Sequence, residues 1–279
     1  MKIVFIIGAG RSGTNLLRDL ICMHPKIKTW PCDEINYILR YRKLIKTFNS
    51  DRLEANDMDS KTQSYLKKQF LKLKGEVVIE KTCANSLRIS YLHRNFPDAK
   101  FIFIHRSGKD VVMSAMKRWK GKVKSKYISS KFRFIPWQNL WFHIPFQIFN
   151  KFYKIIFGNY YRWGPHTSLI NKEKNLVDKC IIQWKECVEK TMEDLNLIDQ
   201  NQFISLDFNF FINNVDSSIE KCLNFIGVSS KDFSKESLYD VIDPGVLSRD
   251  EVKDEIFNHK QLEILNKTED KINCFNKLK

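Results

Sequence analysis

The sequence IVFIIGAGRSGTNLLR, at residues 3–18, combines an apolar strand, a glycine-rich turn and the first turns of a helix. Glycines allow the backbone to approach an anion closely, and the unpaired N–H groups at the start of a helix point towards that anion. Gly8 and Gly13 have the spacing of a Walker A loop, but Thr14 and Asn15 follow them instead of lysine and serine or threonine. The stretch therefore predicts a site for a phosphate-like group that is held without a Walker-type metal ion.

A second apolar strand, AKFIFIHR at residues 99–106, ends in an arginine and is followed by a turn and a helix. Arg106 would lie at the carboxyl end of a parallel strand, where ligands bind in open α/β sheets. Ser114 would lie about two turns into the next helix. An arginine and a serine in this arrangement can hold one phosphate group from two sides, although an ordinary strand-end arginine and helix serine would give the same pattern.

The stretch GAGRSGTNLLRDLICMHP, at residues 8–25, resembles the 5′-phosphosulfate loop of sulfotransferases that use 3′-phosphoadenosine 5′-phosphosulfate (PAPS). It is most similar to the branch that contains tyrosylprotein sulfotransferases and many bacterial sulfotransferases, with Gly10 in place of the usual proline and Asn15 in place of threonine or serine. The resemblance implies that PAPS is the co-substrate, that Arg106 and Ser114 hold its 3′-phosphate, and that the loop holds its 5′-phosphate. The loop residues implied in binding are Arg11, Ser12, Gly13, Thr14 and Asn15.

A short strand over residues 77–80 leads into the sequence Glu80-Lys81-Thr82, which is similar to a strand-end element of the same family. The resemblance implies that Lys81 contacts the bridging oxygen of the departing phosphate, for which a compact ammonium donor is suited. It also implies that Arg11 helps Lys81 to stabilise the charge that gathers on that bridge. We interpret Glu80 as the partner of a neighbouring cation rather than as a group that takes part in the chemistry.

Sulfuryl transfer needs a base that accepts the proton of the acceptor hydroxyl. In the tyrosylprotein-like branch a glutamate follows shortly after the first helix, and the sequence WPCDEIN occupies that place here at residues 30–36. We predict Glu34 as the base and Asp33 as the second candidate, and the alternative is a pair of solvated loop acids. His24 and His105 rank below both, because His24 matches a turn of the family and His105 alternates towards the wrong face of its strand.

Near the C-terminus, the sequence PGVLSRD at residues 244–250 lies where the family has a basic loop that closes on the nucleotide. Ser248 and Arg249 are candidates for contact with the 3′-phosphate or with the substrate. Ser248 is equally suited to cap a helix, and we expect a charged amphipathic helix over residues 251–272.

Strands alternate with helices along most of the chain. Because helical crossovers between strands imply a parallel sheet that is covered on both faces, we predict a P-loop-like three-layer α/β/α fold in one domain of 279 residues. The predicted strands lie at 3–7, 77–80, 100–104 and 202–208, and the predicted helices lie at 14–23, 35–73, 84–95, 109–119 and 174–198.

Residues 120–167 break this alternation with a dense run of aromatic side chains. Positions 145, 149, 152 and 156 follow helical spacing, and lysines interrupt the run, so it predicts an amphipathic helix rather than a transmembrane one. We predict that this insertion forms a lid or wall of the acceptor site and that it can rest on a membrane surface, where aromatic residues and lysines both fit. The alternative is a helical insertion that packs on the core.

The chain carries a net charge of +15, and basic residues are concentrated at 109–133. This charge suits electrostatic steering of a polyanion such as PAPS or an acidic acceptor. It would also suit a nucleic acid, but no nucleic-acid-binding module is recognisable and we expect no such partner. Seven cysteines without a C-x-x-C pair or zinc spacing, and a first strand that begins beside Met1, favour a cytoplasmic protein without a signal peptide or a bound metal.

Together these patterns predict a PAPS-dependent sulfotransferase that acts by direct in-line transfer to a hydroxyl acceptor. The acceptor class stays open between carbohydrate, lipid headgroup, peptide and small molecule. Two alternatives remain. One is a P-loop kinase-like phosphotransferase, which the missing Walker lysine disfavours. The other is a non-catalytic nucleotide-binding protein that keeps the site but has no turnover.

Overall fold

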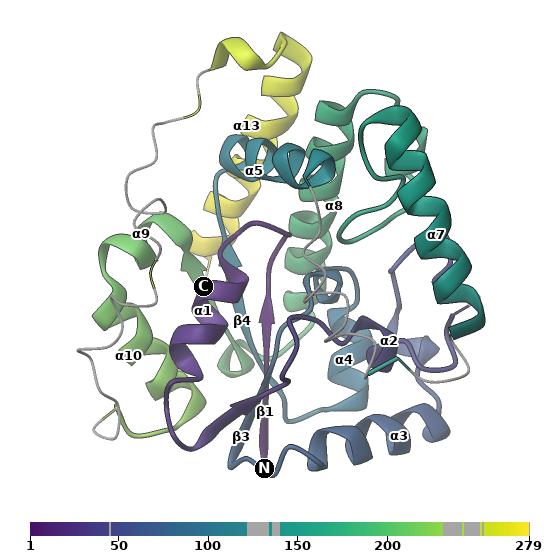
Figure 1. The fold of residues 1–279 in the computed structure, drawn as a ribbon. Coiled ribbons are helices and arrows are strands. Elements are labelled where there is room, and N and C mark those ends of the chain that lie inside the picture. The colour runs from purple at the N-terminus through teal and green to yellow at the C-terminus, as the bar shows by residue number, and fades with distance from the viewer. Residues whose placement is uncertain are drawn as a thin grey trace.

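A five-stranded sheet organises the chain in the computed structural model, which describes residues 1–44, 46–121, 134–135, 140–230, 242, 252 and 254–278 (Figure 1). All of its neighbouring strands are parallel, in the order β2-β3-β1-β4-β5. Its strands are β1 (Lys2–Ile7), β2 (Ile27–Thr29), β3 (Val77–Glu80), β4 (Lys100–His105) and β5 (Phe203–Asp207). The four strands that the sequence predicts are confirmed, and the short edge strand β2 is additional.

Side chains of the sheet alternate between two hydrophobic cores, as the pleat of a strand requires. On β1, Phe5 and Ile7 join one core, whereas Val4 and Ile6 join the other. The first core packs against the helices α3 (Ser60–Leu71), α4 (Ile89–Asn95), α5 (Gly108–Lys120), α8 (Leu176–Leu195) and α13 (His259–Lys277). The second core packs against α1 (Thr14–Ile21), α9 (Phe208–Asn213) and α10 (Val215–Ile226). The predicted three-layer α/β/α architecture is therefore confirmed.

The prediction of one helical stretch over residues 35–73 is wrong. The structure has a single helical turn, α2 (Asn36–Leu39), then the 3₁₀ turn η1 (Ala55–Asp57), and then α3. Between α2 and η1 the chain folds around Asp51, which is 1% exposed and accepts hydrogen bonds from the Arg162 guanidinium (3.0 Å) and the His166 backbone N–H (2.9 Å). A buried carboxylate needs such partners, and they fix a loop here in place of a helix.

Two further helices differ from their predicted bounds. The segment predicted as a helix over 84–95 divides at Arg88, whose φ of −158° separates the 3₁₀ turn η2 (Cys83–Leu87) from α4. The last helix begins at His259 rather than near residue 251, because Asn258 and Gln261 form a capping box at its start.

The described part of the aromatic insertion contains one long helix, α7 (Leu140–Phe157), which lies at one edge of the molecule in Figure 1. The chain then returns towards α5, where the Tyr160 N–H donates to the Trp119 carbonyl at 3.1 Å. Within the described ranges, no helix combines the length and the hydropathy needed to cross a bilayer.

Candidate active site

The loop between β1 and α1 takes a conformation that only glycine can supply at two positions. At Gly8, a Cβ atom would lie 2.5 Å from the Ile104 carbonyl oxygen. Gly13 has a φ of 90° and precedes α1, and a Cβ atom there would lie 2.3 Å from the Phe208 ring. The loop is therefore pressed against the sheet and against α9, with the N-terminus of α1 at its end.

This end of the loop is built to receive an anion. The N–H groups in the first turn of a helix have no intrahelical partner. In α1 no side chain of the described structure caps them either. Ser12 is 1% exposed, and its Oγ atom has no hydrogen-bond partner among the described residues. A phosphate oxygen would satisfy both kinds of donor, so the residues of the loop fit the phosphate of a nucleotide.

Arg11 and Ser114, which are far apart in the sequence, meet beside this loop. The Arg11 Nε donates a hydrogen bond of 3.0 Å to the Ser114 hydroxyl on α5. Arg11 itself has a φ of 78°, in the left-handed region that residues other than glycine rarely adopt. The structure thus joins a residue predicted for the 5′-phosphate to one predicted for the 3′-phosphate.

Arg106 follows β4, as predicted, and is 6% exposed. Its guanidinium donates through Nη2 (2.8 Å) and Nε (3.1 Å) to the Asp110 carboxylate, and it lies 4.5 Å from the centre of the Phe208 ring. Phe208 also packs against Gly13, so one aromatic ring lies between Arg106 and the phosphate loop. Neither Phe208 nor Asp110 was identified from the sequence as part of the site.

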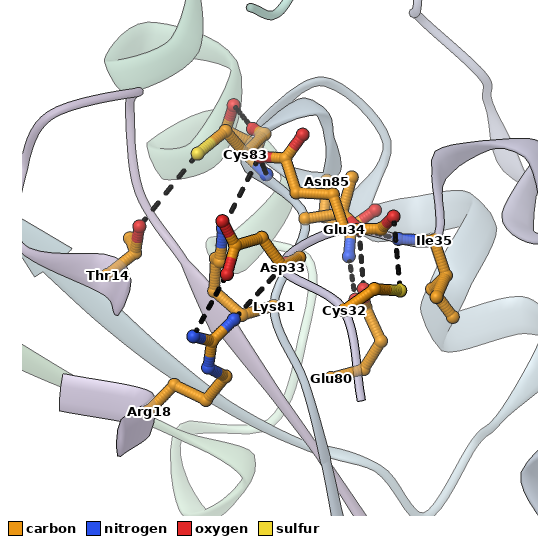
Figure 2. A network of polar contacts seen from close by, with 12 residues as sticks. Thr14, Arg18, Cys32, Asp33, Glu34, Ile35, Glu80, Lys81, Cys83 and Asn85 are labelled. Atoms are coloured by element: carbon orange, nitrogen blue, oxygen red, sulfur yellow. Dashed lines mark hydrogen bonds and ion pairs between the residues drawn. The ribbon is translucent and has the colours of Figure 1, made fainter. Parts of the chain in front are cut away.

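Glu34 and Lys81, the predicted base and the predicted bridging cation, contact each other (Figure 2). The Lys81 Nζ lies 3.4 Å from the Glu34 Oε1, and the Cys83 backbone N–H donates to the same oxygen at 3.2 Å. The Lys81 side chain is 2% exposed and that of Glu34 is 21% exposed. The Thr14 hydroxyl lies 3.8 Å from the Cys83 sulfur, which links this cluster to the start of α1.

A buried network holds the segment that carries Glu34. The Thr82 hydroxyl accepts from the Ile35 N–H at 3.1 Å and donates to the Glu80 carboxylate, and the Asn85 amide donates to the other Glu80 oxygen. Glu80 therefore takes its hydrogen bonds from neutral side chains rather than from the cation that the sequence suggested. Burial raises the pKa of Glu80 to about 7, although the charges of Arg88 and Lys81 oppose this shift.

The other candidate bases are engaged elsewhere. Asp33 accepts from the Arg18 guanidinium at 3.3 Å. The His24 ring bonds the Ser229 carbonyl oxygen (3.1 Å) and accepts from a backbone N–H two residues later (3.2 Å), as a turn residue would. His105 is buried beside Asp207, and burial lowers its pKa. Ser248 and Arg249 lie outside the described residues.

The return segment of the aromatic insertion, which is residues 158–167 after α7, reaches the phosphate loop. A Cβ atom at Gly10 would lie 3.5 Å from the Trp163 ring and 3.8 Å from Pro165. The Gln183 amide on α8 fixes this segment, because it donates to the carbonyl oxygens of Trp163 (2.7 Å) and Pro165 (2.6 Å). The contact places one end of the insertion at the site, and a lid or wall over the acceptor stays a prediction.

A glycine loop ahead of the first helix, with cations at the ends of parallel strands, defines a P-loop-like class of phosphate-binding α/β proteins. Across the described ranges, no group of three or more His, Cys, Asp or Glu side chains could hold a metal ion. The family model described as "Sulfotransferase family" matches residues 4–144. The chain therefore belongs to the sulfotransferase family.

The individual proteins to which the chain is similar in sequence are also sulfotransferases. Human protein-tyrosine sulfotransferase 1 is 30% identical over 132 residues, which cover 42% of this chain and 35% of the human protein. The protein of the same name from Danio rerio is 29% identical over 132 residues, which cover 42% of this chain and 36% of that protein. The match thus spans about a third of the length of these relatives.

A solved structure extends the likeness in fold to nearly the whole chain. The sulfotransferase domain from the curacin biosynthetic pathway superimposes with a TM-score of 0.54 at 13% identity, and the superposition covers 95% of this chain and 96% of that one. At this identity the likeness concerns the fold alone.

Proposed function

We propose that the protein transfers a sulfuryl group from PAPS to a hydroxyl acceptor by direct in-line displacement. The observation that carries the proposal is the contact between Glu34 and Lys81 at the carboxyl end of β3, which is linked through Cys83 to the start of α1. A carboxylate and a buried ammonium side by side, next to an anion-binding loop, supply a proton acceptor and a charge stabiliser in one place. Family membership supports the same reaction.

The residues that would hold the donor are those of the two predicted phosphate sites. The N–H groups at the start of α1 and the Ser12 hydroxyl would bind the 5′-phosphate. Arg106 and Ser114 would bind the 3′-phosphate, and the Arg11–Ser114 hydrogen bond ties the two sites together. In binding the donor, Arg106 would share its guanidinium between Asp110 and a phosphate, which five N–H donors allow.

In the proposed step, the acceptor oxygen forms a bond to sulfur while its proton passes to Glu34. The bond between sulfur and the bridging oxygen of the 5′-phosphate breaks, and its electron pair stays on that oxygen. Lys81 and Arg11 stabilise the charge that results. The products are a sulfate ester and adenosine 3′,5′-bisphosphate, and fixed N–H groups and cations supply the stabilisation.

Isothermal titration calorimetry tests the donor site. We expect the protein to bind adenosine 3′,5′-bisphosphate more tightly than ATP with Mg²⁺, because the loop lacks the Walker lysine. Arg106→Met should weaken bisphosphate binding and leave binding of adenosine 5′-phosphate, which lacks the 3′-phosphate, nearly unchanged. A clear preference for ATP with Mg²⁺ would favour a P-loop kinase-like phosphotransferase instead.

A matched pair of variants tests the base. We expect Glu34→Gln to slow transfer of labelled sulfate by about 10²–10⁴-fold, as loss of a general base does, with bisphosphate affinity retained. Asp33→Asn, at the neighbouring carboxylate that contacts Arg18, should keep most of the rate. If Glu34→Gln keeps the full rate, Glu34 is not the base.

A panel of hydroxyl acceptors, which includes a tyrosine peptide, a sugar, a lipid headgroup and a small alcohol, tests turnover itself. We expect at least one class to be sulfated by the wild-type protein. Tight bisphosphate binding without transfer to any of them would favour a non-catalytic nucleotide-binding protein. We place this activity in the cytoplasm, where seven thiols stay reduced.

A further inference from the structure

Helix α7 presents an apolar stripe outward. Trp141, Ile144, Ile148, Phe152 and Ile155 recur at intervals of three and four residues, so they lie on one face of the helix. Each of the five is at least 45% exposed, and Trp141 and Ile155 reach 81% and 79%. A surface helix ordinarily turns its apolar face to the core, so the orientation of α7 is the reverse of the usual one.

Polar side chains on the opposite face hold α7 in this orientation. Asn150 is 6% exposed, its Oδ1 accepts from the Tyr161 N–H at 2.8 Å, and its Nδ2 donates to the Arg162 carbonyl at 3.0 Å. The Lys154 ammonium donates to the Gly121 carbonyl and lies 4.4 Å from the centre of the Tyr160 ring. These contacts connect α7 to the return segment and to the end of α5, and turning the stripe inward would break them.

The charged residues near α7 in the sequence have one sign. Between Asp110 and Glu173 the sequence contains no acidic residue and twelve lysines and arginines. On α7 itself, Lys151 is exposed at the edge of the stripe. A segment that combines large aromatic and aliphatic residues with lysines, and whose sequence has no acidic residue, matches the interface of a bilayer that contains anionic lipids.

A cavity adjoins the stripe and extends its apolar surface. Its volume is about 450 Å³, and its lining includes Trp141, Pro145 and Phe149 of α7 together with Phe48 and Tyr161. The exposed stripe is therefore continuous with a recess that is large enough for part of a lipid chain or headgroup.

We propose that α7 is an interfacial helix, which lays the stripe of Trp141, Ile144, Ile148, Phe152 and Ile155 into the headgroup region of an anionic bilayer. The helix lies in the plane of the interface and does not span the membrane. Lys151, at the edge of the stripe, contacts a lipid phosphate. This interaction does not depend on the sulfuryl transfer proposed above.

Flotation with vesicles of phosphatidylcholine, with and without about 30 mol% phosphatidylglycerol, tests the proposal. We expect binding to the anionic vesicles that weakens as salt rises. The double substitution Phe152→Asp with Ile155→Asp should weaken this binding at least tenfold, without a change in melting temperature, because both side chains are exposed. Matched controls are Leu71→Asp and Leu197→Asp, at leucines that are 61% and 77% exposed on other elements, and these should bind as the wild type does.

The fluorescence of Trp141 gives a second readout. Among the described tryptophans, Trp30, Trp119 and Trp184 are buried and Trp163 is half-buried, whereas Trp141 is 81% exposed. The part of a blue shift on addition of anionic vesicles that is lost in Trp141→Phe therefore reports contact of Trp141 with the bilayer. Equal binding of stripe and control variants, or binding that is indifferent to lipid charge, would overturn the proposal. So would a dimer, seen by light scattering without vesicles, that the stripe variant converts to monomer, because a second copy would then cover α7.

Discussion

Replacement of Gly13 by alanine would introduce both backbone strain and a steric clash into the phosphate loop. The backbone φ of 90° strains any residue with a Cβ atom, by about 1–2 kcal/mol in the left-handed region. The new methyl group would also lie 2.3 and 2.4 Å from two carbons of the Phe208 ring, and overpacking of this kind costs about 1–3 kcal/mol. We therefore expect Gly13→Ala to lower the free energy of unfolding by roughly 2–5 kcal/mol.

Two other glycines provide matched controls. Gly158 has a φ of 74° but no atom of the described residues within 4 Å of its Cβ position, so Gly158→Ala should show the strain alone, about 1–2 kcal/mol. Gly10 does not have a positive φ, and a Cβ atom at this position would lie no closer than 3.5 Å to a described atom. Gly10→Ala should therefore change stability by no more than about 0.5 kcal/mol.

Thermal unfolding followed by circular dichroism measures these differences. For a chain of this size, about 1 kcal/mol corresponds to roughly 2–4 °C, so Gly13→Ala should melt about 4–20 °C lower and Gly158→Ala about 2–8 °C lower. Calorimetry should also show at least tenfold weaker binding of adenosine 3′,5′-bisphosphate by Gly13→Ala, because relief of the clash moves the loop. If Gly13→Ala melts no lower than Gly158→Ala, the contact with Phe208 does not exist and the account of the loop is wrong.

Three further substitutions follow from contacts described above. Ser114→Ala removes the acceptor of the Arg11 Nε and should weaken bisphosphate binding about 2–10-fold by calorimetry, whereas Ser217→Ala, at an exposed serine of α10, should not. Asp51→Asn leaves the charge of Arg162 poorly compensated and should lower the free energy of unfolding by about 3–5 kcal/mol in urea titrations, and a loss below 1 kcal/mol would contradict the role given to Asp51. Because burial raises the pKa of Glu80 from 4.5 to about 7, its contribution to stability is complete below pH 4.5 and is lost as the pH rises through 7. Urea titrations from pH 5 to 8 should therefore show Glu80→Gln gaining stability relative to the wild type, and parallel pH curves would refute this.

The sequence allowed prediction of the elements that carry strong patterns. Continuous apolar runs before Gly8 and before Arg106 are typical of strands that are buried on both faces, and both strands are present in the sheet. The edge strand β2 has only three residues, Ile27–Thr29, which is too few for any periodicity to appear. The helix predicted over 35–73 failed because helix propensity cannot register the distant partners of Asp51.

The candidate site likewise contains some residues that the sequence predicts and others that it does not. Glu34 and Lys81 follow elements with recognisable ends, and the structure brings them into contact. Phe208 and Trp163 reach the loop from chain segments that are remote in sequence, and nothing local to either residue indicates that contact. The Thr82 and Asn85 bonds to Glu80 leave only a weak signal in the sequence, which is that polar residues follow directly after a buried strand.

The pairing of β4 with β5 has a consequence for synthesis and folding. The two strands pair along their lengths although residues 106–202 separate them, so β4 stays an edge strand until the ribosome has produced β5. Until then the nascent chain exposes the unpaired edge of β4 and the face of Phe103 that contacts Phe275 of α13 in the finished fold. Pairing between strands that are so distant in sequence slows folding, and the unpaired edge of β4 promotes aggregation until β5 has formed. Expression of residues 4–144 alone, the region that carries the family signature, should therefore yield insoluble protein.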